Sequence, residues 1–458
     1  MIDQSRRAFL KQGAALTLMG GAAPFALNLA AIGEAAAATA ADYKALVCIF
    51  LFGGNDYANT VVPYDQASWT QYNALRGTIA TPRDMLAATR LAPSVPLTGG
   101  LEYALAPQLA PLVPIFDAQR LGVVLNVGTL MQPTSKAAYQ NKSVPLPPKL
   151  FSHNDQQSFW QASNPEGATS GWGGRMGDLL MSGNGAASLT CISAAGNAVY
   201  LSGGATLPYN VSTNGPIPLL ANSTSLYGSA AGMSALRTLM TTQRPHLFEA
   251  EHARVSKRSL DLQAQILSAL AAAPALATAF PTGNPLSDQL RIVARMISVS
   301  QALGAKRQVF FVSLGGFDNH DSILTTHPTL LTRLAGAMRA FHDATMELGI
   351  ADRVTSFTAS DFGRTLTSNS NGSDHGWGSH HFVMGGAVRG RGFYGAPPVL
   401  ANNGPDDVGQ GRLLPSLSVD QFGATLARWF GISDGQMATV LPNIVNYNQS
   451  NWNLGFLG

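Results

Sequence analysis

The sequence predicts an α/β protein with a largely parallel central sheet, flanked by helices and carrying loop-rich insertions. Three observations predict it: short runs that are apolar at nearly every position, Gly- or Asp-bearing turns directly after them, and amphipathic stretches between some of them. Strands that are buried on both faces of a parallel sheet have no polar face, so they read as continuous Val, Ile and Phe. Strands that alternate with helices are typical of α/β folds.

Four runs fit such buried strands, and each leads into a polar turn. They are "ALVCIFLF" before "GGND", "LGVVLNV" before "GTLMQPTS", "QVFFVSL" before "GGFDNH" and "RVTSFTA" before "SDFGRT". Helices are expected over residues 286–303 and 334–348, where apolar side chains fall on one stripe. Residues 234–273 predict two helices that are broken near Pro245. Residues 195–230, rich in Gly, Pro, Ser and Asn, predict an insertion or lid.

The start of the chain predicts export. "SRRAFLK" is followed by a weakly apolar, Gly- and Ala-rich stretch and then by "EAAAATAAD". A twin arginine, a mildly apolar segment and a zone of small residues are typical of a twin-arginine (Tat) signal peptide. We therefore expect residues 1–40 to be the signal and residues 41–458 to form a single α/β domain that is periplasmic or secreted.

The composition restricts the partners. The chain has 458 residues, of which 12% are charged, with a net charge of +3 and no basic stripe interleaved with aromatics, so we expect no nucleic-acid partner. No later run has 18 continuous apolar residues, so we expect no membrane span once the signal is removed. Cys48 lies inside an apolar run, where a buried free thiol is expected rather than a disulfide.

Asp and His side chains follow the predicted strands and gather in residues 360–386. Turns after parallel strands meet at one edge of a sheet, where sites form. Mixed Asp and His ligation suits Zn²⁺ or another divalent metal, and two such ions could hold a phosphate or sulfate oxygen. The alternative for an Asp after a strand, Asp56 in particular, is to cap the next helix. The candidate metal ligands are Asp56, Asp318, His320, Asp361, His375, His380 and His381.

Other polar residues are candidates for catalysis. Thr134 and Ser135 precede a predicted helix, where a hydroxyl can act as a nucleophile, although a plain helix cap is the alternative. His153, in "LFSHNDQQSFWQ", could be a ligand, an acid or an oxyanion donor, or a structural histidine. Arg175, in "SGWGGR", could clamp an anion or simply start a surface helix.

These motifs carry a resemblance. "LFGGNDYANTVVPY", "LFSHNDQQSFWQ", "SLGGFDNH" and "SDFGRTLTSNSNGSDHGWGSHHFVMGG" with "GRGFYG" resemble the Tat-exported bacterial family catalogued as domain of unknown function 1501. That family is grouped with the alkaline phosphatase and sulfatase superfamily. The resemblance implies an alkaline-phosphatase-like fold and the hydrolysis or transfer of phosphate or sulfate esters with divalent metals.

The superfamily pattern implies roles for single residues. Asp56 resembles the metal-binding Asp after the first strand, and Thr134 or Ser135 stands for the nucleophile. Asp318 with His320, Asp361 after Ser360, and a final His380 or His381 resemble the remaining metal ligands. The pattern departs at Phe362, which replaces a metal-binding His; His375 or Asp374 could supply the missing ligand.

Two functions follow as hypotheses. The first is an exported hydrolase that depends on Zn, Ca, Mg or Mn and acts on a small anionic ester or a polysaccharide. The second is a non-catalytic relative that binds a ligand or an exported protein partner during envelope assembly, because the family is often encoded beside another exported family. Phe362 favours the second hypothesis, and convergence of the Asp and His side chains would favour the first.

Overall fold

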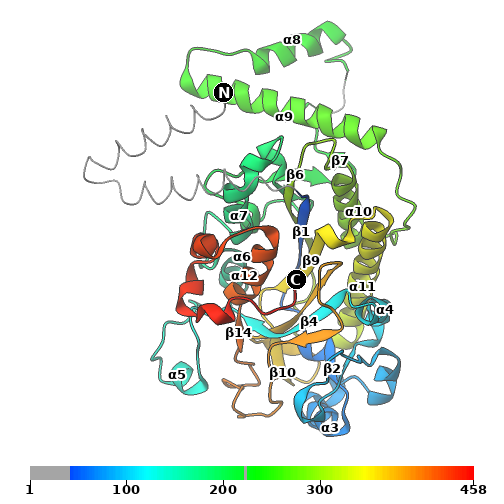
Figure 1. The fold of residues 1–458 in the computed structure, drawn as a ribbon, viewed down its shortest axis with the longest axis vertical. Coiled ribbons are helices and arrows are strands. Elements are labelled where there is room, and N and C mark those ends of the chain that lie inside the picture. The colour runs from blue at the N-terminus through cyan, green and yellow to red at the C-terminus, as the bar shows by residue number, and fades with distance from the viewer. Residues whose placement is uncertain (1–41, 221–223) are drawn as a thin grey trace, which may run out of the picture.

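The structure is a computed structural model that describes residues 42–220 and 224–458. Its centre is a ten-stranded sheet in the order β13-β4-β12-β9-β1-β8-β5-β6-β7, with β14 beside β4 (Figure 1). Two small sheets, β10-β11 and β2-β3, lie outside it. The strands are β1 Lys44–Leu51, β2 Val61–Pro63, β3 Tyr103–Leu105, β4 Leu121–Gly128, β5 Cys191–Ser193, β6 Tyr209–Ser212, β7 Gly215–Pro216, β8 Arg307–Leu314, β9 Val354–Ser360, β10 Arg364–Ser368, β11 Ser373–His375, β12 Ser379–Gly385, β13 Gly392–Tyr394 and β14 Leu417–Ser418.

The central sheet is mixed and mostly parallel. β1 runs parallel to its neighbours β8 and β9, and β5 continues this arrangement beyond β8. β12 is antiparallel to both β9 and β4. The predicted α/β class is therefore confirmed, and the four runs predicted as strands are β1, β4, β8 and β9.

Helices cover both faces of the sheet. Alternate residues of a strand point to opposite faces, so one apolar strand contributes side chains to the core on each side. In β1, Val47 and Ile49 belong to one core cluster with α10 and α11, whereas Cys48 and Phe50 belong to another with α7 and α12 (Figure 1). The helices are α3 Gln66–Arg76, α4 Val113–Asp117, α5 Lys136–Gln140, α6 His153–Ala162, α7 Trp172–Leu180, α8 Ala230–Thr241, α9 Leu247–Ala272, α10 Pro285–Ser298, α11 Ile323–Glu347, α12 Val419–Phe430 and α13 Met437–Val440.

The predicted helices are present with shifted ends. α10 begins at Pro285, capped by the Asn284 side chain, and α11 begins well before residue 334. The break near Pro245 separates α8 from α9, as expected. Residues 195–230 hold β6 and β7, which extend the edge of the central sheet.

Two further expectations concern the thiols and the membrane. Both Cys48 and Cys191 are buried and free. None of the helices in the described ranges is long and apolar enough to cross a membrane. The predicted signal, residues 1–40, lies outside the described residues.

Candidate functional site

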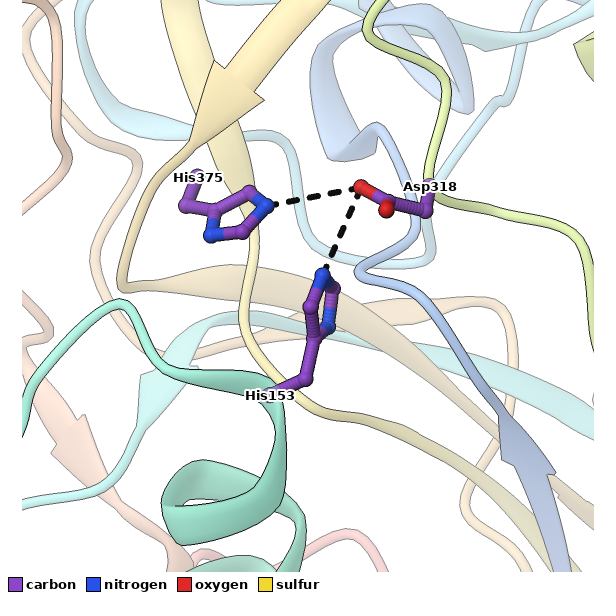
Figure 2. Close-up of side chains that lie close together, drawn as sticks. All are labelled: His153, Asp318 and His375. Carbon is purple, nitrogen blue, oxygen red and sulfur yellow. Dashed lines mark ion pairs between the residues drawn. The ribbon is translucent and has the colours of Figure 1, made fainter.

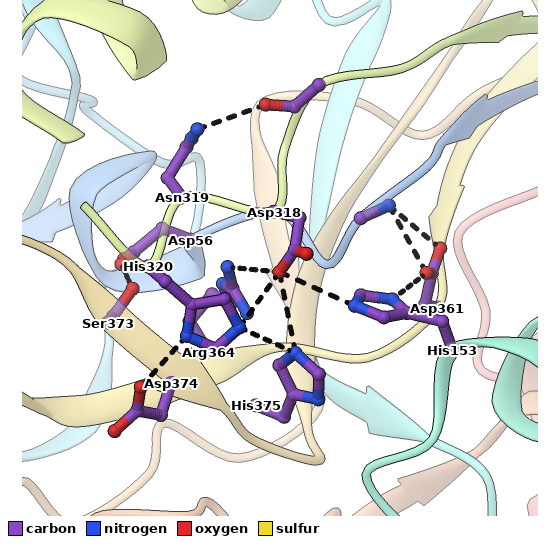
Figure 3. Close-up of polar contacts among 12 residues, drawn as sticks. Asp56, His153, Asp318, Asn319, His320, Asp361, Arg364, Ser373, Asp374 and His375 are labelled. Carbon is purple, nitrogen blue, oxygen red and sulfur yellow. Dashed lines mark hydrogen bonds and ion pairs between the residues drawn. The ribbon is translucent and has the colours of Figure 1, made fainter. Parts of the chain in front are cut away.

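The candidate site forms where β1, β8 and β9 end side by side, because parallel neighbours end at the same edge of a sheet. The turn after β8 contributes Asp318 and His320, and β9 ends directly before Asp361. Two further segments reach this edge: the start of α6, with His153, and the hairpin β10-β11, which ends in His375 (Figure 3). Segments that lie far apart in the sequence therefore meet here.

Three imidazole rings converge on Oδ1 of Asp318, those of His153 and His375 (Figure 2) and that of His320 (Figure 3). The Nε2 atoms of His153 and His375 lie 3.4 Å from this oxygen, and Nε2 of His320 lies 3.1 Å from it. The Nε2 atoms of His320 and His375 are 2.8 Å apart. Four ligand atoms around one ion, each about 2.0–2.1 Å from it, are separated by roughly 3.3 Å, so this spacing is close to that of a metal site.

Each imidazole uses its other nitrogen, Nδ1, to donate to an acceptor outside the cluster. A carbonyl or carboxylate oxygen can only accept, so Nδ1 of each neutral ring carries the proton and Nε2 presents a lone pair. The three pairs (Figure 3) are His153 with Asp361 at 2.6 Å, His320 with Asp374 at 2.9 Å and His375 with the carbonyl of Phe151 at 2.7 Å.

This arrangement points lone pairs at one another. Nε2 of His153 is buried and has no hydrogen-bond partner among the residues that the structure describes. Single ligand atoms of His153, Asp318 and His375 all lie within 4.8 Å of one another. Lone pairs held this close need a proton or a cation between them, and metal-bound histidines commonly donate their second N–H to a carboxylate or a backbone carbonyl. The residues present therefore fit a divalent metal ion.

Asp361 supports the cluster rather than joining it. Its carboxylate accepts from His153, from Nε2 of Gln157 at 2.8 Å and from the backbone N–H of Gly53 at 3.2 Å. Oδ2 of Asp361 is taken by His153 and Gln157, and the structure groups His153, Asp318 and His375 as possible ligands without Asp361, so the predicted ligand Asp361 serves here as a support. Gly53 has φ +112°, and a Cβ there would lie 2.4 Å from the backbone nitrogen of Asp318. Only glycine allows this close approach of two turns.

Phe362, where the resemblance expects a ligand, has a packing role. Its ring is buried, and its centroid lies 4.8 Å from that of His153 and 4.7 Å from that of His375. The ring forms an apolar floor beneath two of the imidazoles. The sequence offered His375 or Asp374 as a replacement for the ligand missing at Phe362. His375 supplies a nitrogen to the cluster, whereas Asp374 accepts a hydrogen bond from His320 outside it.

Arg364 is a member of the site that the sequence did not reveal. It pairs in register with His375 across the hairpin β10-β11, and its Nη2 donates to Oδ1 of Asp318 at 2.8 Å. The side chain is fully buried, and its Nε and Nη1 have no partner among the described residues. "SDFGRT" contains this arginine three residues after Asp361, but only the hairpin brings it to Asp318.

The charges of the site favour the ligand forms of Asp318 and His375 but favour the protonated form of His153, from which a metal ion would displace a proton. Burial alone would raise the pKa of Asp318, but the neighbouring Arg364 and His153 lower that pKa below its usual value. Burial lowers the pKa of His375, and the nearby charges of His153 and Arg364 act in the same direction. The hydrogen bond to Asp361 raises the pKa of His153. Asp318 is thus ionised and His375 neutral near pH 7.

Asp56 does not join the cluster. Its carboxylate caps the short helical turn Tyr57–Asn59 and forms a buried ion pair with Arg76 at 2.6 Å. It also accepts from the hydroxyl of Ser373 at 2.7 Å, at the start of β11. The alternative interpretation, a cap, is therefore correct for this residue, which stabilises the hairpin that carries His375.

His380 and His381 also lie elsewhere, in the buried strand β12 and not in a loop. Nδ1 of His380 accepts from the backbone N–H of Asn126 in β4. The ring of His381 packs edge-on against Trp160. Both side chains are core residues, because β12 is buried between β4 and β9. This corrects their assignment as metal ligands.

The expected nucleophiles and the expected anion clamp are held by other partners. The hydroxyl of Ser135 caps α5, and that of Thr134 donates to the carbonyl of Gln132. Arg175 donates to the carbonyls of Val440, Ser170 and Ala162. Of the four residues predicted to be catalytic, the structure brings only His153 to the cluster.

A second arginine lies at the rim of the site. Arg412 donates from Nε to the backbone carbonyl of His375 at 3.1 Å, and its guanidinium stacks 4.4 Å from the ring centroid of Phe151. Phe151 has φ 75°, which is unfavourable for a bulky residue. This backbone places its carbonyl on His375 and its ring under Arg412, and such outliers are often found at functional sites.

The sequence model of one protein family matches residues 43–445. The chain belongs to the family described as Protein of unknown function (DUF1501). The match to DUF1501 covers every residue of the cluster, from His153 to His375. Comparison of this DUF1501 chain with curated protein sequences gives no match.

Several solved structures resemble the DUF1501 chain at low sequence identity. One is Ps i-CgsB in complex with k-i-k-neocarrahexaose, at 9% identity and a TM-score of 0.35, covering 89% of this chain and 77% of that one. Another is the PsFucS1 sulfatase from Pseudoalteromonas sp., at 10% identity and a TM-score of 0.32, covering 94% of this chain and 75% of that one. A third is a mutant of the alkaline phosphatase PafA, at 11% identity and a TM-score of 0.28, covering 71% of this chain and 64% of that one.

Proposed function

We propose that this protein is an exported hydrolase of phosphate or sulfate esters that depends on one divalent metal ion. The observation that supports it is the convergence of three Nε2 lone pairs on Oδ1 of Asp318, with each Nδ1 proton donated outward. His153, Asp318 and His375, whose ligand atoms lie within 4.8 Å of one another, would hold the ion, and His320, which lies beside Asp318 and His375, would add a fourth ligand.

The donor set favours one kind of metal. Three imidazoles and one carboxylate suit Zn²⁺ or a similar transition metal, whereas Ca²⁺ and Mg²⁺ prefer oxygen ligands. Such an ion, when bound, acts as a Lewis acid toward an ester oxygen and lowers the pKa of water. Arg364 holds Asp318, and the acceptors on Asp361, Asp374 and Phe151 hold the three imidazoles. These contacts fix the orientation of the ligands.

The substrate class is proposed from the charge at the rim. Arg412 is positioned by its stacking on Phe151, and its terminal nitrogens make no ion pair among the described residues. A fixed guanidinium beside a metal suits an anionic group such as phosphate or sulfate. The resemblance of the motifs to the alkaline phosphatase and sulfatase superfamily supports the same class, for a small ester or a polysaccharide.

The compartment is a further part of this proposal. The twin-arginine pattern of residues 1–40 supports export to the periplasm or beyond. Residues 41–458 would then act as the mature single domain.

A second candidate function is favoured by a specific observation. Neither Thr134 nor Ser135 joins the cluster, since both hydroxyls have local partners. A metal-bearing relative that binds an anionic ligand or an exported protein without turnover fits this observation. The two candidates share the cluster and differ in catalysis.

Turnover assays separate these candidates. Aryl phosphate and aryl sulfate esters and a sulfated polysaccharide are tested with the wild type, His320→Ala and Arg412→Gln. We expect wild-type turnover that chelation abolishes and Zn²⁺ restores, none in His320→Ala, and a KM raised by about tenfold or more in Arg412→Gln with kcat largely kept. Turnover that survives both chelation and His320→Ala contradicts the proposal. Bound metal without turnover on any ester favours the binding role.

A further inference from the structure

The helical hairpin α8-α9 stands apart from the body of the protein (Figure 1). α8 begins and α9 ends on the same side of the hairpin, and the turn of residues 242–246 lies at the opposite, free end. The C-terminal half of α9 is anchored, because Leu262 and Ile266 are buried in the main core. α9 thereby acts as a rigid support that carries the turn outward.

The free end exposes large apolar side chains. Leu247 and Phe248, the first residues of α9, are 77% and 78% exposed, and Leu239 near the end of α8 is 60% exposed. Phe248 and Val255 continue the stripe of Leu262 and Ile266 along one side of α9, beyond the point where the body covers it. Soluble proteins rarely leave such a group of apolar side chains uncovered.

The hairpin covers little of this apolar surface itself. Met233 is the buried side chain of α8, and the N-terminal half of α9 buries Ala253 and Ser256. A hollow of about 260 Å³ remains between the two helices at the free end, with Leu239 and Phe248 in its lining. The free end is therefore open to an apolar partner.

The charge around these residues is mostly basic. Residues 237–248, "RTLMTTQRPHLF", contain Arg237, Arg244 and His246 but no Asp or Glu, and the acidic residue of this end is Glu249, which follows Phe248 and also lines the hollow. All three side chains are exposed, and neither arginine forms an ion pair within the described part of the chain. Basic residues that flank exposed Leu and Phe are typical of segments that lie in the interface of an anionic bilayer.

We propose that the free end of the α8-α9 hairpin binds an anionic phospholipid surface. Leu239, Leu247 and Phe248 enter the boundary between headgroups and acyl chains, and Arg237 and Arg244 contact the lipid phosphates. The protein is then held at a membrane surface by its hairpin while the metal cluster, on a different part of the fold, stays in water. This inference does not depend on the proposed hydrolase activity.

Vesicle binding tests the proposal. The full-length protein, the double variants Leu247→Glu/Phe248→Glu and Arg237→Glu/Arg244→Glu, and the control Val95→Glu are sedimented with vesicles of phosphatidylglycerol and phosphatidylethanolamine or of phosphatidylcholine alone. Val95 is a matched control because it is 77% exposed on a different surface. Circular dichroism establishes that each variant is folded.

We expect the wild type and Val95→Glu to bind the anionic vesicles, more weakly at high salt, and to bind phosphatidylcholine poorly. Both hairpin variants should lose at least tenfold in partitioning. Absence of wild-type binding, or binding that neither hairpin variant reduces, overturns the proposal. Sedimentation velocity without lipid tests whether a second copy of the chain covers this surface instead. If the wild type forms a dimer that Leu247→Glu/Phe248→Glu abolishes, and no protein binds vesicles, the surface is a dimer interface and the lipid proposal is overturned.

Discussion

The Nε2 atoms of His320 and His375 lie 2.8 Å apart, and the proton of each ring is committed to an acceptor on its far side. Without a cation between them these atoms would repel each other, unless one ring were protonated. Burial and nearby positive charge lower the pKa of His375, which disfavours its protonation. A bound metal ion is the simplest account of this pair.

Asp361 should set metal affinity without being a ligand. In Asp361→Asn the charged acceptor of Nδ1 of His153 becomes a neutral amide, so the ring loses part of its orientation and basicity. We expect a fall of about 10–100-fold in Zn²⁺ affinity with the bound stoichiometry unchanged. Competition with a chromophoric chelator measures it, and an unchanged affinity would show that Asp361 does not support the site.

Gly53 should tolerate no side chain. Gly53→Ala places a Cβ in contact with the backbone of Asp318 at a φ of +112°, so the turn that carries two ligands must move. We expect a loss of about 1–3 kcal/mol in the free energy of unfolding together with weaker metal binding. Gly99→Ala is the control: its φ is +73°, no atom of the described residues lies within 4 Å of the added Cβ, and the cost should be about 1–2 kcal/mol with metal binding intact. Equal metal binding in the two variants would contradict the account.

Asp56 should matter for stability and not for ligation. Asp56→Asn leaves the buried guanidinium of Arg76 without its counter-charge, which typically costs about 3–5 kcal/mol. Urea unfolding measures this loss, and metal analysis of the folded fraction should give the wild-type stoichiometry. Loss of the metal without loss of stability would return Asp56 to the list of ligands.

The buried histidines of β12 should make stability depend on pH. Burial lowers the pKa of both His380 and His381 to about 3, from 6.5 for an exposed histidine. The unfolded chain therefore binds more protons between these values, so stability is complete above pH 6.5 and falls as the pH drops toward 3. Each histidine contributes a slope of up to about 1.4 kcal/mol per pH unit. His380→Asn keeps an acceptor for Asn126 and should flatten the dependence measured from urea midpoints at pH 7 and 5.5; identical slopes would refute this.

The sequence was sufficient for the central strands and for part of the site. Continuous apolar runs identified β1, β4, β8 and β9, and the polar turns after two of them supplied Asp318, His320 and Asp361. β12 was missed because "SHHFVMG" begins with three polar residues, although its pairing with β4 and β9 buries them all. Arg364 was missed because its position beside Asp318 depends on the hairpin β10-β11.

The division between ligands and supports was also beyond the sequence. Asp318 and Asp361 look equivalent as residues after strands, but Asp361 is surrounded by donors and Asp318 faces three imidazoles. Asp56 differs from both because Arg76, from the following helix, neutralises it. Only the three-dimensional arrangement decides which carboxylate is free for a metal.

Metal content is the most direct test of the central claim. The wild type, His375→Ala and the control His252→Ala, which removes an exposed histidine on α9, are purified together, loaded with Zn²⁺, dialysed and analysed by inductively coupled plasma mass spectrometry. The account predicts about one equivalent of Zn²⁺ in the wild type and in His252→Ala, and less than about a tenth of that in His375→Ala. Equal metal content in all three proteins, or none in the wild type, would contradict it.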